Sequence, residues 1–167
     1  EYSSHYVFSP KKPRIKKAFP EFNHFEEKNR KESAFCLCYL HDAGHKMANT
    51  VLSRFYSKFL RKEPDSEKSF IKACKMIAAF FTLWRSALSN QGLDDEYRKL
   101  LQDKISWKAN PNPSIKALQE CFNIILNNQN IGTRERWMRK AQQNLKYDLA
   151  PKAVCRFTLF ITSQDTI

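Results

Sequence analysis

Two cysteines and two histidines lie within ten positions of one another in the segment CLCYLHDAGHK, residues 36–46. Thiolates and imidazoles are preferred zinc ligands, so this segment is a candidate metal site. On a helix, Cys36 and Cys38 point about 200° apart and cannot chelate one ion, whereas Cys38, His41 and His45 share a face. The same face continues an apolar stripe, so buried structural histidines are the alternative. We expect these histidines to be structural and the chain to hold no metal or other cofactor.

The dipeptide His41-Asp42 adds a second interpretation of the same segment. The letters LHDAGH resemble the core motif of the HD-type metal-dependent phosphohydrolases, which are all-helical enzymes. The resemblance implies a metal site at His41, Asp42 and His45. Those enzymes also need an earlier histidine and a later aspartate. His24 is the candidate for the first, and Asp94 or Asp95 for the second.

The charge of the chain indicates a polyanionic partner. Its 29 basic and 17 acidic side chains give a net charge of +12, which suits nucleic acid first. The alternative is that these residues only solvate helix faces. One concentration of charge lies in residues 1–23, where three prolines disfavour a regular helix and aromatic residues are interleaved. We expect an extended basic arm there, binding a phosphate backbone, or else an interdomain linker. Its basic residues are Lys11, Lys12, Arg14, Lys16 and Lys17.

A second concentration of charge falls on a predicted helix that begins after the N-cap Thr133. Arg136, Arg139 and Lys140 lie close together on one face of this helix and are candidate phosphate ligands. A solvated surface is the alternative. No base-reading motif is recognisable, so we expect weak, sequence-independent binding to DNA.

Hydrophobic periodicity predicts helices throughout the remainder, with no convincing two-residue alternation. We therefore predict an all-α fold, a single domain of about six helices over residues 24–167 that follows the basic arm. Helical periodicity runs from about residue 26 to residue 60, with Gly44 as a weak point. A central helix around Trp84 is apolar on several sides and should be surrounded by others. The remaining predicted starts are Asp94 as an N-cap, Asn112 as an N-cap with Pro113 as first helical residue, Thr133 as an N-cap, and Pro151.

The cysteines and the apolar segments bear on location. Five cysteines is an odd number, and reduced thiols in the cytoplasm are expected. Cys74, Cys121 and Cys155 fall on apolar helix faces and are predicted to be small core residues. The longest apolar run is far shorter than a membrane span, so no membrane association is expected. The chain does not begin with Met, and we expect it to be part of a longer protein.

Two segments resemble the GmrSD-type and SspE-type restriction proteins. IAAFFTLWRSALSNQGLDDEYRKLL contains Leu83-Trp84-Arg85 and, after a short loop, Tyr97-Arg98, similar to an aromatic-rich helix and the helix that follows it in that family. The later segment PKAVCRFTLFITSQDT resembles the Arg-Phe-x-Leu-Phe helix that precedes the family's nuclease. The resemblance covers about 50 of the 167 residues.

The resemblance implies a place within a larger protein. In that family an all-helical region connects an N-terminal nucleotide-using sensor of DNA modification to a C-terminal HNH-like nuclease. The motifs of both flanking domains are absent from this sequence, so the chain would be the helical middle and no catalytic residue can be carried over. Trp84, Arg85, Tyr97 and Arg98 match only as packing and junction residues. Its partners would be DNA and the flanking domains; an HD-type phosphohydrolase and a standalone nucleic-acid-binding domain are the alternatives.

Overall fold

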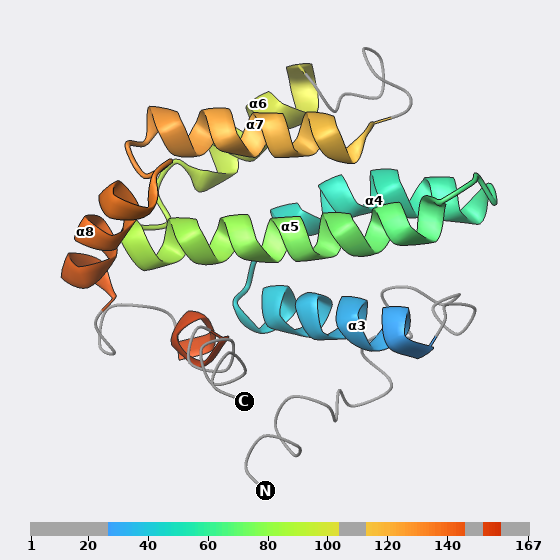
Figure 1. The fold of residues 1–167 in the computed structure, drawn as a ribbon, viewed down its shortest axis with the longest axis horizontal. Coiled ribbons are helices and arrows are strands. Elements are labelled where there is room, and N and C mark those ends of the chain that lie inside the picture. Colours follow the sequence, from blue (N-terminus) through green and yellow to red (C-terminus); the bar gives the residue numbers. More distant parts are fainter. Residues whose placement is uncertain (1–26, 104–112, 146–151, 158–167) are drawn as a thin grey trace, which may run out of the picture.

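A computed structural model describes residues 27–103, 113–145 and 152–157, and the protein is all-α in these ranges, with no strand among them. The prediction of the fold class is confirmed. Figure 1 shows the helices packed around one long central helix. They are α3 (Glu27–Asp42), α4 (Met47–Leu60), α5 (Ser66–Ala87), α6 (Leu93–Asp103), α7 (Ile115–Asn128) and α8 (Arg134–Asn144), followed by a helical segment at 152–157.

The long helix α5 is the centre of the fold because it is apolar on several sides. It packs against α3, α4, α7 and α8, which come from both ends of the described chain. Its buried residues include Phe70, Ile77 and Phe81, and Trp84 is 1% exposed. The prediction that this helix is central and that Trp84 is buried is confirmed. Burial of this many large apolar side chains is the main force that holds the helices together.

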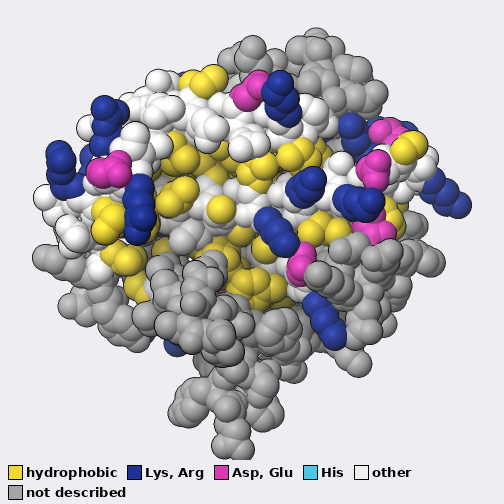
Figure 2. Space-filling view, in the orientation of Figure 1, with side chains coloured by type: hydrophobic (Ala, Val, Ile, Leu, Met, Phe, Trp, Pro, Cys, Tyr) yellow, Lys and Arg dark blue, Asp and Glu magenta, His cyan; other side chains and the backbone are white. Residues whose placement is uncertain are grey.

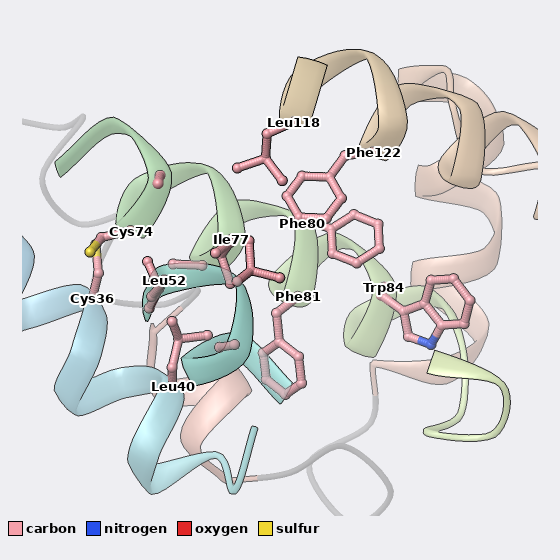
Figure 3. Packing of buried hydrophobic residues seen from close by; sticks show 14 of the residues in the cluster. Cys36, Leu40, Leu52, Cys74, Ile77, Phe80, Phe81, Trp84, Leu118 and Phe122 are labelled. Carbon is pink, nitrogen blue, oxygen red and sulfur yellow. The ribbon is translucent and has the colours of Figure 1, made fainter. Parts of the chain in front are cut away.

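Aromatic rings connect the helices within this core (Figure 3). The rings of Phe80 on α5 and Phe122 on α7 are stacked with centroids 4.1 Å apart. Tyr97 on α6 meets both rings edge-on. A separate pair joins α3 to the C-terminal segment: the rings of Tyr39 and Phe157 are stacked with centroids 3.8 Å apart, which holds the segment 152–157 against α3. Stacked and edge-on pairs add directional preference to apolar burial, so these rings help to fix how the helices sit.

The long stretch of helical periodicity between residues 26 and 60 is divided in two. The predicted weak point, Gly44, adopts a φ of +71°, a conformation that glycine enters without strain. α3 ends at Asp42, two residues before it, and α4 begins at Met47. The chain therefore reverses here, and α3 and α4 both lie along α5.

Helix starts were predicted with mixed success. Thr133 caps α8 as predicted, since its side-chain oxygen accepts a hydrogen bond from the Arg136 amide at 3.4 Å. The predicted cap Asp94 is wrong, because α6 already begins at Leu93 and places this carboxylate in the first turn. The predicted start of α7 is also wrong: Ser114, not Asn112, is the cap, and it accepts from the Ala117 amide at 3.0 Å. Pro113 thus precedes the cap instead of opening the helix.

The cysteines that the structure describes are thiols and not disulfides, and Cys74 and Cys121 lie in the main apolar cluster as predicted. Cys155 is buried as well. Among the described helices, none combines the length and the apolar character needed to span a bilayer.

Candidate nucleic-acid interface

The candidate metal ligands on α3 do not come together. α3 ends at Asp42, so the expectation that Cys38, His41 and His45 share one helical face is wrong. His41 stays exposed, with its Nδ1 atom 3.2 Å from Oδ1 of Asp42, whereas His45 is only 6% exposed. Within the described ranges, no three His, Cys, Asp or Glu side chains are grouped so that they could hold a metal ion.

His45 packs into the aromatic core. Its ring is stacked on Phe81 with centroids 4.3 Å apart and meets Tyr97 edge-on at 4.8 Å. Burial lowers the pKa of His45 to about 4, and the nearby Asp94 carboxylate opposes that shift only in part. The Nε2 atom of His45 has no hydrogen-bond partner among the described residues. His45 is therefore a neutral packing residue at neutral pH, which agrees with the structural role expected for it.

The other positions suggested by the HD-type motif have different surroundings from one another. Asp94 lies near the buried His45, whereas Asp95 forms an exposed ion pair with Arg98 at 2.8 Å. His24 lies outside the described residues. The geometry of the described part of the motif thus offers no argument for metal-dependent hydrolysis.

The basic helix α8 is fixed to the C-terminal end of α5 by side-chain hydrogen bonds. The indole Nε1 of Trp137 donates to the carbonyl of Leu83 at 3.1 Å and to the hydroxyl of Ser86 at 3.0 Å. The amide of Asn144, one to two turns further along, donates to the carbonyl of Ala87 at 2.8 Å. These two anchors set which face of α8 is turned toward the core and which toward solvent.

Trp137 and Asn144 were not recognised as anchors in the sequence. Their spacing of seven residues, with the buried Ala141 between them, places all three on one side of a helix. This spacing is visible in the sequence. However, asparagine is polar and charged residues surround these positions, so the sequence does not indicate that this face of the helix packs against the core. The partners at the end of α5 are two backbone carbonyls and the Ser86 hydroxyl, and no sequence pattern reveals such long-range contacts.

The predicted phosphate ligands on α8 fall into two groups. Arg136 and Arg139 are exposed, as is Arg134, and none has an acidic group within 4 Å among the described residues. Lys140 differs, because it is half-buried and its Nζ donates to the carbonyl of Gln129 at 2.8 Å. Gln129 is the residue that follows α7, so Lys140 satisfies a free carbonyl at a helix C-terminus. A phosphate ligand should be exposed, and that expectation, made for all three side chains, is wrong for Lys140.

The one acidic residue of α8, Glu135, interacts electrostatically with its neighbour Arg134 but forms no ion pair with Arg136 or Arg139. Glu135 interacts with its own backbone amide and with the Thr133 side chain, and these hydrogen bonds lower the pKa of its carboxyl group. A carboxylate near a helix N-terminus is also favoured by the helix dipole. The Glu135 side chain is thus engaged at the helix cap, and Arg139, four residues along, has no ion pair with it.

Six of the twelve exposed Lys and Arg side chains outside α8 in the described ranges form an ion pair with an acid in the same or a neighbouring segment. Lysines at 46, 62, 72 and 152 lack such a pair among the described residues, but they come from four different segments. α8 differs from these segments in presenting three such charges within six residues. The described pairs are Lys58–Glu63, Arg61–Glu63, Lys68–Asp65, Lys75–Glu32, Arg98–Asp95, Lys99–Glu96 and Lys116–Glu120.

The charges of α8 face the same side of the molecule as part of α5. Figure 2 shows Lys and Arg side chains over α8, at the left of the view, and others over the N-terminal half of α5. Hydrophobic side chains lie between them on this face. The arm residues Lys11, Lys12, Arg14, Lys16 and Lys17 lie outside the described residues.

The residues that match the restriction-protein pattern occupy two kinds of position. Trp84 and Tyr97 are 1% exposed and belong to the core. Arg85 is half-buried near the end of α5, where burial lowers the pKa of its guanidinium. Arg98 is exposed and paired with Asp95. Comparison with protein-family models gives no match to this chain, and comparison with curated proteins gives none either.

Proposed function

We propose that this chain contacts DNA through the outer face of α8, by charge and without reading sequence. The observation that carries the proposal is the exposed cluster of Arg134, Arg136 and Arg139, in which Arg134 interacts with the neighbouring Glu135 while Arg136 and Arg139 form no ion pair with a described acidic group. Guanidinium groups suit phosphate because they donate several hydrogen bonds in a fixed plane. Trp137 and Asn144 hold the opposite side of the helix, so the arginines are presented from a supported element.

We propose further that the chain is the helical connecting region of a modification-dependent restriction endonuclease of the GmrSD or SspE type. This wider proposal rests on the resemblance around Trp84-Arg85 and Tyr97-Arg98. In such a protein the DNA contact would lie between a nucleotide-using sensor and an HNH-like nuclease, and this region would carry no catalytic residue. A helical bundle built around one long helix is suited to transmitting a rigid-body movement between its neighbours.

Fluorescence anisotropy with a labelled DNA duplex tests the contact. We expect dissociation constants in the micromolar range or weaker, with little dependence on sequence. Each phosphate contact contributes about −0.9 to the slope of log affinity against log salt concentration on duplex DNA. The double variant Arg136→Glu/Arg139→Glu should therefore bind more weakly and with a shallower slope, by about 2 if both residues contact phosphate.

Two matched controls separate position from net charge. Lys116→Glu, on the exposed side of α7, and Arg98→Glu, on α6, each reverse one charge outside α8. Together they change net charge as much as the α8 double variant does, so similar losses from both double variants would show that only overall charge matters. Lys140 is left unchanged because its side chain holds the end of α7. Absence of binding at low salt would exclude the proposed contact.

A further inference from the structure

Two buried thiols lie between α3 and α5. Cys36 belongs to α3 and Cys74 to α5, two helices that pack along one another. Cys36 is 5% exposed and Cys74 is fully buried. In Figure 3 their side chains converge at the contact between the two helices. Burial raises the pKa of the Cys74 thiol well above its usual range, and the nearby Cys36 raises it further, which agrees with the proximity seen in the figure.

We propose that Cys36 and Cys74 form an intramolecular disulfide when the protein meets a peroxide, and that this bond ties α3 to α5. The proposal is independent of the DNA contact on α8, because neither cysteine belongs to that helix. The two sulfurs come from helices that are already packed together, so no rearrangement of the fold is needed to bring the two residues into the same region.

The chemistry needs one molecule of hydrogen peroxide. The sulfur of one cysteine, as thiolate, attacks a peroxide oxygen; the O–O bond breaks, leaving a sulfenic acid and hydroxide. The second sulfur then attacks the sulfenic sulfur, the S–O bond breaks, and a second water forms as the protons are taken up. Overall, two thiols lose two electrons and two protons, and the peroxide is reduced to two waters.

Burial controls when the reaction takes place. The thiolate is the nucleophile, and desolvation raises the pKa of Cys36 to about 12, although the nearby Lys75 lowers it in part. The closed state therefore holds little thiolate and admits little peroxide. Reaction should follow transient separation of α3 from α5, after which closure brings the two sulfurs together. Conditions that favour local opening should accelerate disulfide formation.

Peptide mapping of the full chain tests the proposal. Reduced protein is treated with hydrogen peroxide in buffer and in urea below the unfolding transition, then blocked with N-ethylmaleimide and digested without reductant. We expect a linked peptide pair that contains Cys36 and Cys74 and has lost two hydrogens, formed faster in the presence of urea. The bond closes a loop of about 40 residues, so the melting temperature should rise by about 5 °C or more after oxidation.

Matched variants identify the bond. Cys36→Ala and Cys74→Ala should each abolish the linked peptide and the rise in melting temperature, whereas Cys121→Ala should retain both. The half-buried Cys38 on α3 serves as an internal reference for ordinary thiol oxidation. Oxidation of Cys38 without any Cys36–Cys74 link in the wild-type chain would overturn the proposal, as would a link that joins a different pair. Mapping on the wild type keeps the test valid even where a variant fails to fold.

Discussion

Helices α6 and α8 have the same length of 11 residues, yet they are attached to the rest of the protein in different ways. α6 is held by apolar burial, with Leu93, Tyr97 and Leu100 each no more than 4% exposed. α8 buries only Ala141 and is held by hydrogen bonds from Trp137, Lys140 and Asn144 to backbone carbonyls and a hydroxyl. α6 is thus part of the core, whereas α8 is attached to the end of the core by hydrogen bonds.

The same two helices also differ in how their charges are used. On α6, Arg98 pairs with Asp95 and Lys99 pairs with Glu96, each pair three residues apart. On α8, the exposed arginines form no ion pair within the described part of the chain, although Arg134 interacts electrostatically with Glu135. Exposed pairs within one helix contribute little stability, but they leave less charge available to a phosphate. The comparison shows that a count of basic residues is a poor guide to a binding surface, and that the distribution of acidic neighbours decides which charges remain available.

Truncation of Trp84 should have the largest effect on the free energy of unfolding, because this residue lies near the end of α5 that supports α6 and α8. Its ring packs on Phe80, and its Nε1 donates to the carbonyl of Ser89 in the connection to α6. Trp84→Ala should lower the free energy of unfolding by about 3–5 kcal/mol. Chemical denaturation followed by circular dichroism measures this. A variant that unfolds at the wild-type denaturant concentration would show that the core is not centred on α5.

Acid should weaken the attachment of α6, because the buried His45 packs against Tyr97. The ordinary pKa of histidine is 6.5, and burial lowers it to about 4 in the folded state. Between these values the unfolded chain binds the extra proton, so stability falls as the pH drops from about 6.5 to about 4. This residue should contribute a loss of about 3 kcal/mol across that window. Denaturation at several pH values measures it.

The variant His45→Phe serves as a control for the acid effect. Phenylalanine can keep the stacking on Phe81 but cannot bind a proton, so the loss of stability over this pH window should become smaller. An unchanged pH dependence in His45→Phe would show that other groups, such as the carboxylates, account for the acid sensitivity.

Two conservative substitutions, one on α8 and one on α6, should have the smallest effects on the free energy of unfolding. Trp137→Phe removes both hydrogen bonds of the indole and should cost about 1–2 kcal/mol, with faster amide hydrogen exchange confined to α8. Tyr97→Phe removes a buried hydroxyl that has no hydrogen-bond partner in the described ranges, so the free energy of unfolding should stay within about 0.5 kcal/mol of the wild-type value or rise. If Tyr97→Phe lowered the free energy of unfolding more than Trp137→Phe did, the distinction between α6, held by apolar burial, and α8, held by hydrogen bonds, would be wrong.

Much of the helical framework could be predicted from the sequence. Apolar residues at helical spacing gave α5 and its buried Trp84, and the break at Gly44 followed from the low helix propensity of glycine. The misplaced starts of α6 and α7 have a common cause. Asp94 and Asn112 are suitable caps by residue type, but α6 begins one residue earlier, at Leu93, and Ser114 caps α7; several candidate caps in one short segment cannot be ranked by type alone.

The candidate site was less predictable, because its properties depend on contacts between segments far apart in the chain. The sequence alone determined that α8 is rich in arginine and begins directly after the cap Thr133, since both are local properties. Only the tertiary structure decided that Lys140 binds the Gln129 carbonyl, while Arg136 and Arg139 form no ion pair with an acidic residue in the described ranges. Likewise, a chain reversal at Gly44 turned His45 into the core. Local sequence sets which helices form; the packing between helices sets which of their side chains remain available to a partner.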